Sequence, residues 1–383
     1  MQKENILKIF LAFLLMGVAF NATSQDQEQH PELEQHAEHQ DQAEHGELSA
    51  VDTEEEIKEY IDHHLQDSHD FTFFSDAETG AHYSFPLPVI LWDEGLKVFS
   101  SGKFHHGEEV AEVDGQYYRL YHSKIYETDA EGTIQYGEDG YPSNERPLDF
   151  SITKNVVTMI LVSILMFVLF RSLANSYKKR TIPRKFGRVL EPLILYVRDD
   201  IAKPNIGPKY RKYMGFLLTV FFFIWILNLL GMTPLGVNVT GNIAVTFALA
   251  LVTFIIVQFS GNKSYWKHIF WMPGVPWPMK IIMAPIELLG LFVKPFSLMI
   301  RLYANMTAGH VVIMTLLGLI VIFKNWIAGP AFFGFTIFIS VIELLVAFLQ
   351  AYIFTLLSAL YIGAAVEEHD HDHPADNEDV PVL

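Results

Sequence analysis

Residues 214–262 form a stretch of 49 residues without a single Asp, Glu, Lys, Arg or His. A transmembrane helix needs about 20 predominantly apolar residues, so this stretch is long enough for two spans. A TPLG sequence at residues 233–236, near its middle, supplies a turn. The sequence therefore predicts a helical hairpin over residues 214–260 that crosses a membrane twice.

Apolar residues elsewhere in the chain are also gathered into long runs. The chain has 383 residues, of which 50% are hydrophobic, and further runs cover residues 150–170, 281–323 and 330–366. This distribution is typical of an all-α polytopic membrane protein, here with five crossings. The chain contains no cysteine, which excludes disulfides and thiolate chemistry.

The N-terminal part of the chain has a different composition. Residues 1–24 carry two lysines, a short apolar core and a small-x-small pattern, which predicts a cleaved signal peptide; the alternative is a retained anchor, and either way the next segment is exported. Residues 25–70 are rich in Gln, Glu, Asp and His, which favours a disordered segment. Residues 71–149 contain short aromatic and β-branched runs cut by Gly and Pro, which indicates a small extramembrane region of short strands.

The distribution of basic residues predicts the orientation in the membrane. Residues 171–213 hold twelve Lys or Arg against three Asp or Glu, and the loop at residues 261–280 holds three lysines and no acid. The positive-inside rule makes both segments cytoplasmic, and helical spacing in the first favours an interfacial helix. The N-terminus is then periplasmic, and the acidic tail, residues 367–383, is cytoplasmic. No internal repeat is visible, which weakens an inverted-repeat transporter.

The last two apolar runs are too long for upright helices. Residues 281–323 would form a helix of about 60 Å, roughly twice the thickness of the bilayer core. Most transmembrane helices tilt by only about 20°. We therefore expect two oblique helices, the first of them strongly tilted or bent near Pro295.

Isolated polar residues lie inside the first of these helices. Ser297, Arg301 and Asn305 are spaced by four and share one face, and Glu287, fourteen residues before Arg301, returns close to that face. His310 stands nine residues beyond Arg301, which places it on the opposite face. An intramembrane charge is expensive and marks function by default, although Arg301 could also snorkel to the cytoplasmic interface.

The final helix carries a single acid, Glu343, with eighteen uncharged residues before it and twenty-three after. Gln350 lies two turns later on the same face. Amides such as Asn305 and Gln350 often serve only as hydrogen bonds between helices. Together with Arg301 and His310, however, these residues indicate a water-accessible ion path with one fixed cation and two groups that exchange protons.

Two segments resemble a known family, subunit a of the F-type rotary ATP synthase. KPFSLMIRLYANMTAGH, residues 294–310, is similar to that family's signature around its essential arginine, and IELLVAFLQAYIFTLLSALYIGAAVEEH, residues 342–369, is similar to its last helix. The resemblance is close over residues 285–367 and loose over residues 80–370. In a common bacterial pattern the residue at position 310 is Glu and that at 343 is His. Here they are exchanged, as in the mitochondrial form, which favours a pair that acts jointly.

The resemblance implies a role in the membrane sector of that enzyme. The chain would form two proton half-channels against a ring of c subunits and couple proton flow across the inner membrane to ATP synthesis. Its partners would be the c-ring, the subunit b stator stalk, the remaining ATP synthase subunits and membrane lipid, with no nucleic acid, cofactor, metal or ATP-hydrolysing site of its own. By resemblance Arg301 faces the rotor, Asn305 and Gln350 are its polar neighbours, and the proton path includes Glu287, His310, Glu343 and Ser297.

Other classes of membrane protein fit the sequence less well. A secondary transporter or channel would require broken helices or repeats, and a voltage sensor would require several arginines at every third position. A metal-sensing receptor would place its function in the His-rich segment, residues 25–70, where no spacing is sharply ligand-like.

Overall fold

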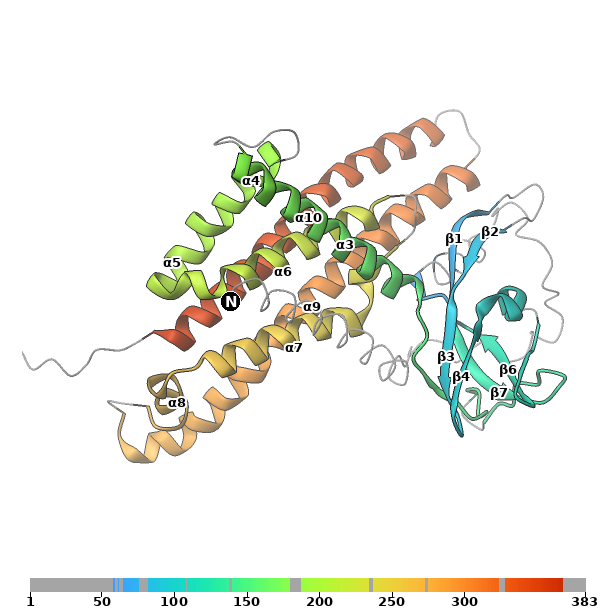
Figure 1. Ribbon diagram of the computed structural model, residues 1–383, viewed down its shortest axis with the longest axis horizontal. Coiled ribbons are helices and arrows are strands. Elements are labelled where there is room, and N and C mark those ends of the chain that lie inside the picture. The colour runs from blue at the N-terminus through green and yellow to red at the C-terminus, as the bar shows by residue number, and fades with distance from the viewer. Residues whose placement is uncertain are drawn as a thin grey trace, which may run out of the picture.

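The computed structural model describes residues 65–367 together with Lys58 and Ile61, apart from gaps at residues 76–81, 108, 138–139, 180–186, 234–236, 273–274 and 324–327. The predicted signal peptide, most of the predicted His-rich segment and almost all of the acidic tail lie outside the described residues. The described chain divides into a domain of strands, up to residue 149, and a bundle of long helices (Figure 1). After the orientation that the sequence predicts, we call the strand domain the exported domain, the helix ends next to it the exported ends, and the opposite helix ends the cytoplasmic ends.

The exported domain is built from three small antiparallel sheets. Strand β3 lies between β4 and β8 in one sheet, β6 lies between β5 and β7 in another, and β1 pairs with β2. Side chains from both three-stranded sheets and from η1 form one small core, because alternate residues of a strand point to the same face. The elements are β1 Asp70–Ser75, β2 His82–Pro86, β3 Pro88–Trp92, β4 Leu96–Ser100, η1 Ser101–Gly107, β5 Ala111–Val113, β6 Gln116–Tyr121, β7 Lys124–Thr128 and β8 Leu148–Asp149.

The rest of the chain is helical. Five stretches of helix within the described residues are long and apolar enough to cross a membrane, which confirms the predicted all-α polytopic fold with five crossings. The elements are α3 Lys154–Lys179, α4 Gly187–Tyr196, η2 Val197–Ala202, α5 Lys203–Ile206, η3 Gly207–Lys209, α6 Tyr210–Gly231, η4 Val239–Gly241, α7 Ile243–Ser260, α8 Lys263–Phe270, α9 Trp277–Ile322 and α10 Ala328–Val366.

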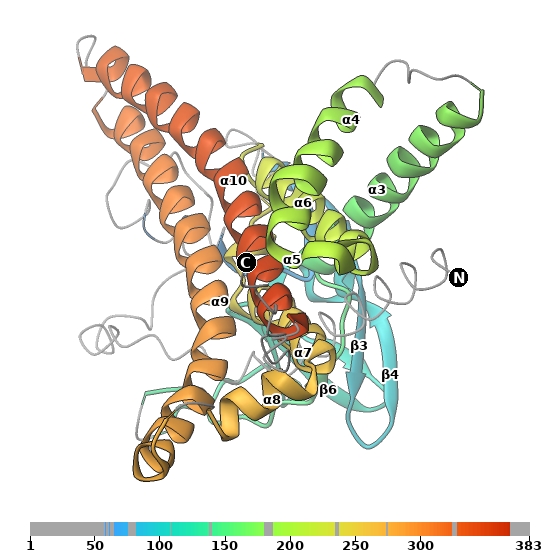
Figure 2. The ribbon, with the colours of Figure 1, turned by 90° about the vertical axis from the view of Figure 1, so that its left-hand side faces the viewer.

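The two predicted oblique helices are α9 and α10. Helix α9 is a single element of 46 residues that continues through Pro285 and Pro295, and α10 has 39 residues. Two views show that they run side by side and that their distal ends extend beyond the other helices (Figures 1 and 2). One side of this pair is therefore free of contact with the rest of the described chain.

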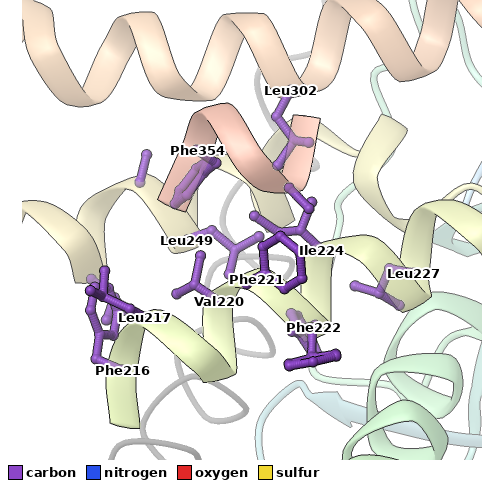
Figure 3. Close-up of a cluster of buried hydrophobic side chains, with 14 of the residues drawn as sticks. Phe216, Leu217, Val220, Phe221, Phe222, Ile224, Leu227, Leu249, Leu302 and Phe354 are labelled. Carbon is purple, nitrogen blue, oxygen red and sulfur yellow. The ribbon is translucent and has the colours of Figure 1, made fainter. Parts of the chain in front are cut away.

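Helix α6 lies at the centre of the bundle. Its aromatic residues Phe221 and Phe222 are buried, and side chains of α7, α9 and α10 converge on it, including Leu249, Leu302 and Phe354 (Figure 3). A helix that is apolar on all sides requires such burial. Helix α6 thereby fixes the position of the inner faces of α9 and α10.

Hydrogen bonds attach the exported domain to the first span. Asp67 accepts from the Thr153 hydroxyl at 2.8 Å and from the backbone N–H of Asn155 at 3.1 Å, so it caps the start of α3. The backbone N–H of Lys154 donates to the Ser68 carbonyl at 3.0 Å. Phe71 of β1 belongs to the same apolar cluster as the bundle. The domain is thus held at the exported end of α3.

Candidate functional site

Glu343 lies in close contact with α9. Its side chain is 8% exposed, and its carboxylate occupies the space that a Cβ at Gly309 would need. Position 309 therefore requires glycine as long as Glu343 keeps this place. The acid of α10 lies directly beside the backbone of α9, one residue before His310.

A second contact fixes the registration of the two antiparallel helices. The Lys294 ammonium of α9 lies 5.6 Å from the centroid of the Tyr361 ring of α10. Arg301 is about 12 Å from Gly309 along α9, and Gln350 is about 10 Å from Glu343 along α10. Arg301 and Gln350 consequently lie at nearly the same depth, and Gln350 is buried.

Arg301 is on the open side of the helix pair. Its side chain is partly buried, and in the part of the chain that the structure describes it has no ion pair and no hydrogen bond. The neighbouring Ala304, Asn305 and Ala308 are exposed. A charge inside a membrane needs a partner, and small residues let another helix approach closely. This face therefore offers an unpaired cation to a partner helix.

His310 is on the inner side of α9, as the helical spacing predicts. It is buried with Met306 against α6, where a Cβ at Gly231 would lie 3.5 Å from the imidazole Cε1. The Lys154 ammonium at the start of α3 is near enough to act on it electrostatically. Between His310 and Glu343 the described residues show no direct bond. The two side chains instead line different sides of the same turn of α9.

Several buried polar atoms near the exported end of the bundle have no hydrogen-bond partner among the described residues. They are His310 Nδ1 and Thr307 Oγ1 on α9, Asn155 Oδ1 on α3 and Asn238 Nδ2 beside η4. Element η4 packs against both α3 and α9. Buried polar groups are nearly always satisfied by protein or by water, so this region is suited to hold water next to His310.

Asn228 of α6 is a site residue that the sequence reading missed. Its Nδ2 donates to the Ala347 carbonyl at 3.4 Å, and its Oδ1 accepts from the Thr240 hydroxyl at 2.7 Å. Ala347 lies one turn after Glu343, so these bonds position the polar part of α10. The only available signal was that Asn228 is the single amide in the apolar run of α6.

A small cavity, lined mostly by apolar side chains, lies beside α9 on the cytoplasmic side of Arg301. It lies between α7, α8, α9 and α10, and its volume of ≈ 20 Å³ gives room for about one water. Polar groups of Gln258, Tyr265, Lys294 and Tyr361 line it. Ser297 is partly buried one turn from Arg301, and Glu287 is partly buried nearer the cytoplasmic end of α9. The structure does not bring Glu287 into contact with His310 or Glu343.

In the part of the chain that the structure describes, no group of three or more His, Cys, Asp or Glu residues could hold a metal ion. Most of the His-rich segment on which a metal-sensing receptor would depend lies outside that part.

The fold and the site define a class, the multi-pass membrane proteins that carry an unpaired arginine and isolated proton-exchanging groups inside their helices. The ATP synthase A chain family matches residues 156–363. Three proteins named ATP synthase subunit a are similar to this chain. That of Chloroherpeton thalassium is 47% identical over 59% of this chain and 70% of its own length. That of Myxococcus xanthus is 46% identical over 59% and 78%, and one from Chlorobaculum tepidum is 49% identical over 58% and 66%. The chain belongs to the ATP synthase subunit a family, the proton-translocating membrane subunit of that enzyme.

The exported domain has a separate match. Residues 60–150 match a family described only as a domain of unknown function.

Proposed function

We propose that the chain forms two proton half-channels against a ring of c subunits and thereby couples proton flow across the inner membrane to ATP synthesis. The observation that carries the proposal is Arg301, a fixed cation without a partner among the described residues, on a face of α9 lined by exposed small residues. A ring helix that carries a carboxylate fits this face, since it supplies both the missing charge and a close packing surface.

The entry path begins at the exported end of the bundle. Protons pass the unpartnered polar atoms around His310 and reach Glu343, which lies two turns or so from the depth of Arg301. Histidine and glutamate both exchange protons, and they lie on either side of one turn of α9. The joint action of this pair is part of the proposal, with water as the link between them.

The exit path lies on the other side of Arg301. The cavity beside Lys294 and Tyr361 supports a polar route toward the cytoplasm, with Ser297 and Glu287 along the same helix. The guanidinium of Arg301 stays protonated, so it attracts an ionised ring carboxylate, favours release of its proton and repels a proton that would cross directly. Asn305 and Gln350 are the polar neighbours of the arginine along the path of the ring carboxylate.

The proposal also includes the orientation of the chain in the membrane and its assembly with the other subunits. The N-terminus is periplasmic, the C-terminus is cytoplasmic, and the subunit b stalk holds the chain against the turning ring. Each charge that falls through the membrane potential contributes about 2.3 kcal/mol per 100 mV, so several protons are collected for each ATP.

The proposal is tested by Arg301→Ala in inverted membrane vesicles that contain the assembled enzyme. ATP-driven proton pumping should be abolished, because the ring carboxylate loses the cation that makes it release its proton. Ser297→Ala, one turn away, removes only a neutral hydroxyl from the proposed exit path and should keep more pumping than Arg301→Ala. Normal pumping by Arg301→Ala would contradict the proposal.

A second test concerns the pair of proton-exchanging residues. The double swap His310→Glu with Glu343→His keeps one acid and one imidazole, so it should retain more pumping than either single swap. Complete loss of pumping in an assembled double variant would rule out joint action of the pair.

A further inference from the structure

One face of the exported domain exposes two rows of apolar side chains. The register pairs Trp92 of β3 with Leu96 of β4 on one side and with Leu148 of β8 on the other. The next row crosses the same sheet at Ile90. Trp92 is 56% exposed, Leu96 is 62% exposed and Leu148 is 56% exposed. We name this surface the outer sheet face, and its six residues are Ile90, Trp92, Leu96, Val98, Leu148 and Phe150.

The described residues of the domain leave this face exposed. The alternate residues of the same strands, Val89, Leu91 and Phe99, point to the opposite side and fill the core. A contiguous exposed apolar surface on a folded domain marks an interaction site. The question is therefore what covers the outer sheet face.

The chain connects this face directly to the first membrane span. The Phe150 N–H donates to the Ile90 carbonyl at 2.8 Å and the Ile152 N–H donates to the Pro88 carbonyl at 3.1 Å, so the sheet pairing continues almost to Lys154, where α3 begins. From Lys154 to Arg171, the first basic residue of the cytoplasmic segment, the helix rises about 26 Å, close to the roughly 30 Å of the hydrocarbon core. The outer boundary of the hydrocarbon thus lies at the start of α3, beside the sheet.

The two ribbon views place β3 and β4 beside the bundle. In Figure 1 they lie beyond the nearest ends of α3 and α7 and below the ends of α9 and α10. In Figure 2, which looks from the opposite end of the bundle, they lie next to the helices and not behind them. The outer sheet face therefore extends over the area that lipid occupies around the bundle.

We propose that the outer sheet face lies in the headgroup region of the exported leaflet and anchors the domain on the lipid surface. The face is continuous with the lipid-facing surface of α3, where Leu161, Ile164 and Phe167 are exposed. Tryptophan and phenylalanine are the side chains that membrane interfaces favour. The six residues carry no charge, so the contact depends on apolar burial and does not require anionic lipid.

The absence of cysteine from the chain makes a direct test possible. Single variants Trp92→Cys and Leu148→Cys, with Ala130→Cys as an exposed control on the loop after β7, are made in the full chain and reconstituted into phosphatidylcholine vesicles. Each cysteine is assayed for its rate of labelling by a membrane-impermeant maleimide. Each is also labelled with an environment-sensitive fluorophore, and quenching by brominated acyl chains is measured.

The proposal predicts that positions 92 and 148 label about tenfold more slowly than position 130, which corresponds to about 1.4 kcal/mol of protection. Brominated lipid should quench the fluorophore at 92 and 148 but not at 130, equally at low and high salt. Equal labelling rates at all three positions would overturn it. Slow labelling without quenching by lipid would also overturn it, because the face would then be covered by protein, either another part of this chain or a second copy. Positions 92 and 148 are tested in separate variants. If one variant fails to fold, the other still tests the proposal.

Discussion

The exported domain and the helical bundle differ in whether their buried ionisable side chains have a partner within the chain. In the exported domain, buried ionic groups have a charged or polar partner within the chain, although one ring nitrogen, His69 Nδ1, has no hydrogen-bond partner among the described residues. His69 Nε2 lies 2.9 Å from the Asp149 carboxylate, and the Lys97 ammonium donates to the Tyr118 hydroxyl at 2.6 Å. The Tyr118 hydroxyl in turn donates to Asp93 at 2.6 Å. These groups stabilise the domain as built.

In the bundle the ionisable side chains of the site have no ion-pair partner among the described residues. Arg301, His310 and Glu343 form no ion pair within the described residues, whereas His69 of the exported domain is paired with Asp149. A buried charge without a partner costs several kcal/mol. The cost is acceptable only if a partner from outside the chain, a ring carboxylate or water, completes the site. The comparison teaches that an ion pair within the chain distinguishes the structural charges of the exported domain from the bundle residues that we propose to act in transport.

The largest effect, on the rate of proton transport, should come from replacing an ionisable residue of the bundle that has no ion-pair partner in the described chain. Glu343→Gln keeps the volume beside Gly309 but cannot exchange a proton, so proton transport should fall at least about 10²-fold, the usual scale for loss of an acid–base group. ATP-driven acidification of inverted vesicles measures the rate. Ser297→Ala should lower the rate less than Glu343→Gln does, and equal rates for the two variants would contradict a role for Glu343.

Breaking a pair of the exported domain should instead affect stability. His69→Ala leaves Asp149 buried and unpaired, which costs about 3–5 kcal/mol, whereas replacing both by apolar residues costs less. Amide hydrogen exchange in β3 and β8 of the full chain measures the loss. Pumping by the assembled enzyme should stay close to normal. A loss of pumping in an enzyme whose exported domain stays folded would contradict the purely structural role of the His69 and Asp149 pair.

The same pair should make the exported domain sensitive to pH. Burial alone lowers the pKa of His69, but the hydrogen bond and charge of Asp149, with Asp67 and Asp70, outweigh it and raise that pKa above 6.5. Burial alone raises the pKa of Asp149, but His69 and Ser151 outweigh it and lower that pKa below 3.8.

The sign of the pH effect follows from these two shifts. The contribution of His69 is complete below pH 6.5 and is lost as the pH rises through its folded pKa, and that of Asp149 is complete above pH 3.8 and is lost as the pH falls. Protection of β3 and β8 against hydrogen exchange, corrected for intrinsic rates, should be greatest between these values. A His69→Ala, Asp149→Ala double variant should lose this dependence, and an unchanged profile would show that other groups cause it.

A smaller effect is expected at the second network. Tyr118→Phe removes the hydroxyl that links Lys97 to Asp93 and leaves both less well satisfied, at a cost of about 1–3 kcal/mol. The ammonium and carboxylate remain 3.6 Å apart, so part of the network survives. Exchange protection of β6 measures the change, and Tyr117→Phe on the neighbouring, partly exposed position is the control. Equal loss of exchange protection in the two variants would show that the hydrogen-bond network does not contribute to the stability of the domain.

The number of crossings and the solitary charges could be predicted because they are local properties of the sequence. The lengths of the apolar runs indicate five spans. A single arginine inside an apolar run can be recognised from the sequence without knowing which residues lie near it in the fold. The contact of Glu343 with Gly309 and the bonds of Asn228 could not be predicted, because they depend on how two helices register against each other. Spacing placed His310 opposite Arg301, and the burial of His310 against α6 agrees with it.

The strand β4 shows most clearly what only the tertiary structure decides. In the sequence Leu-Lys-Val-Phe-Ser, alternation alone permits Leu96 and Val98 to face the core with Lys97 in water. The structure has the reverse arrangement, with Lys97 buried at 7% exposure and Leu96 and Val98 outside. The reason is physical: Tyr118 and Asp93 satisfy the ammonium inside, and the proposed contact of the outer sheet face with lipid would give Leu96 and Val98 an apolar surrounding outside. The sequence by itself determined where the charges and apolar runs lie. Only the fold decided which charges are paired, because partners such as His69 and Asp149 are 80 residues apart in the chain.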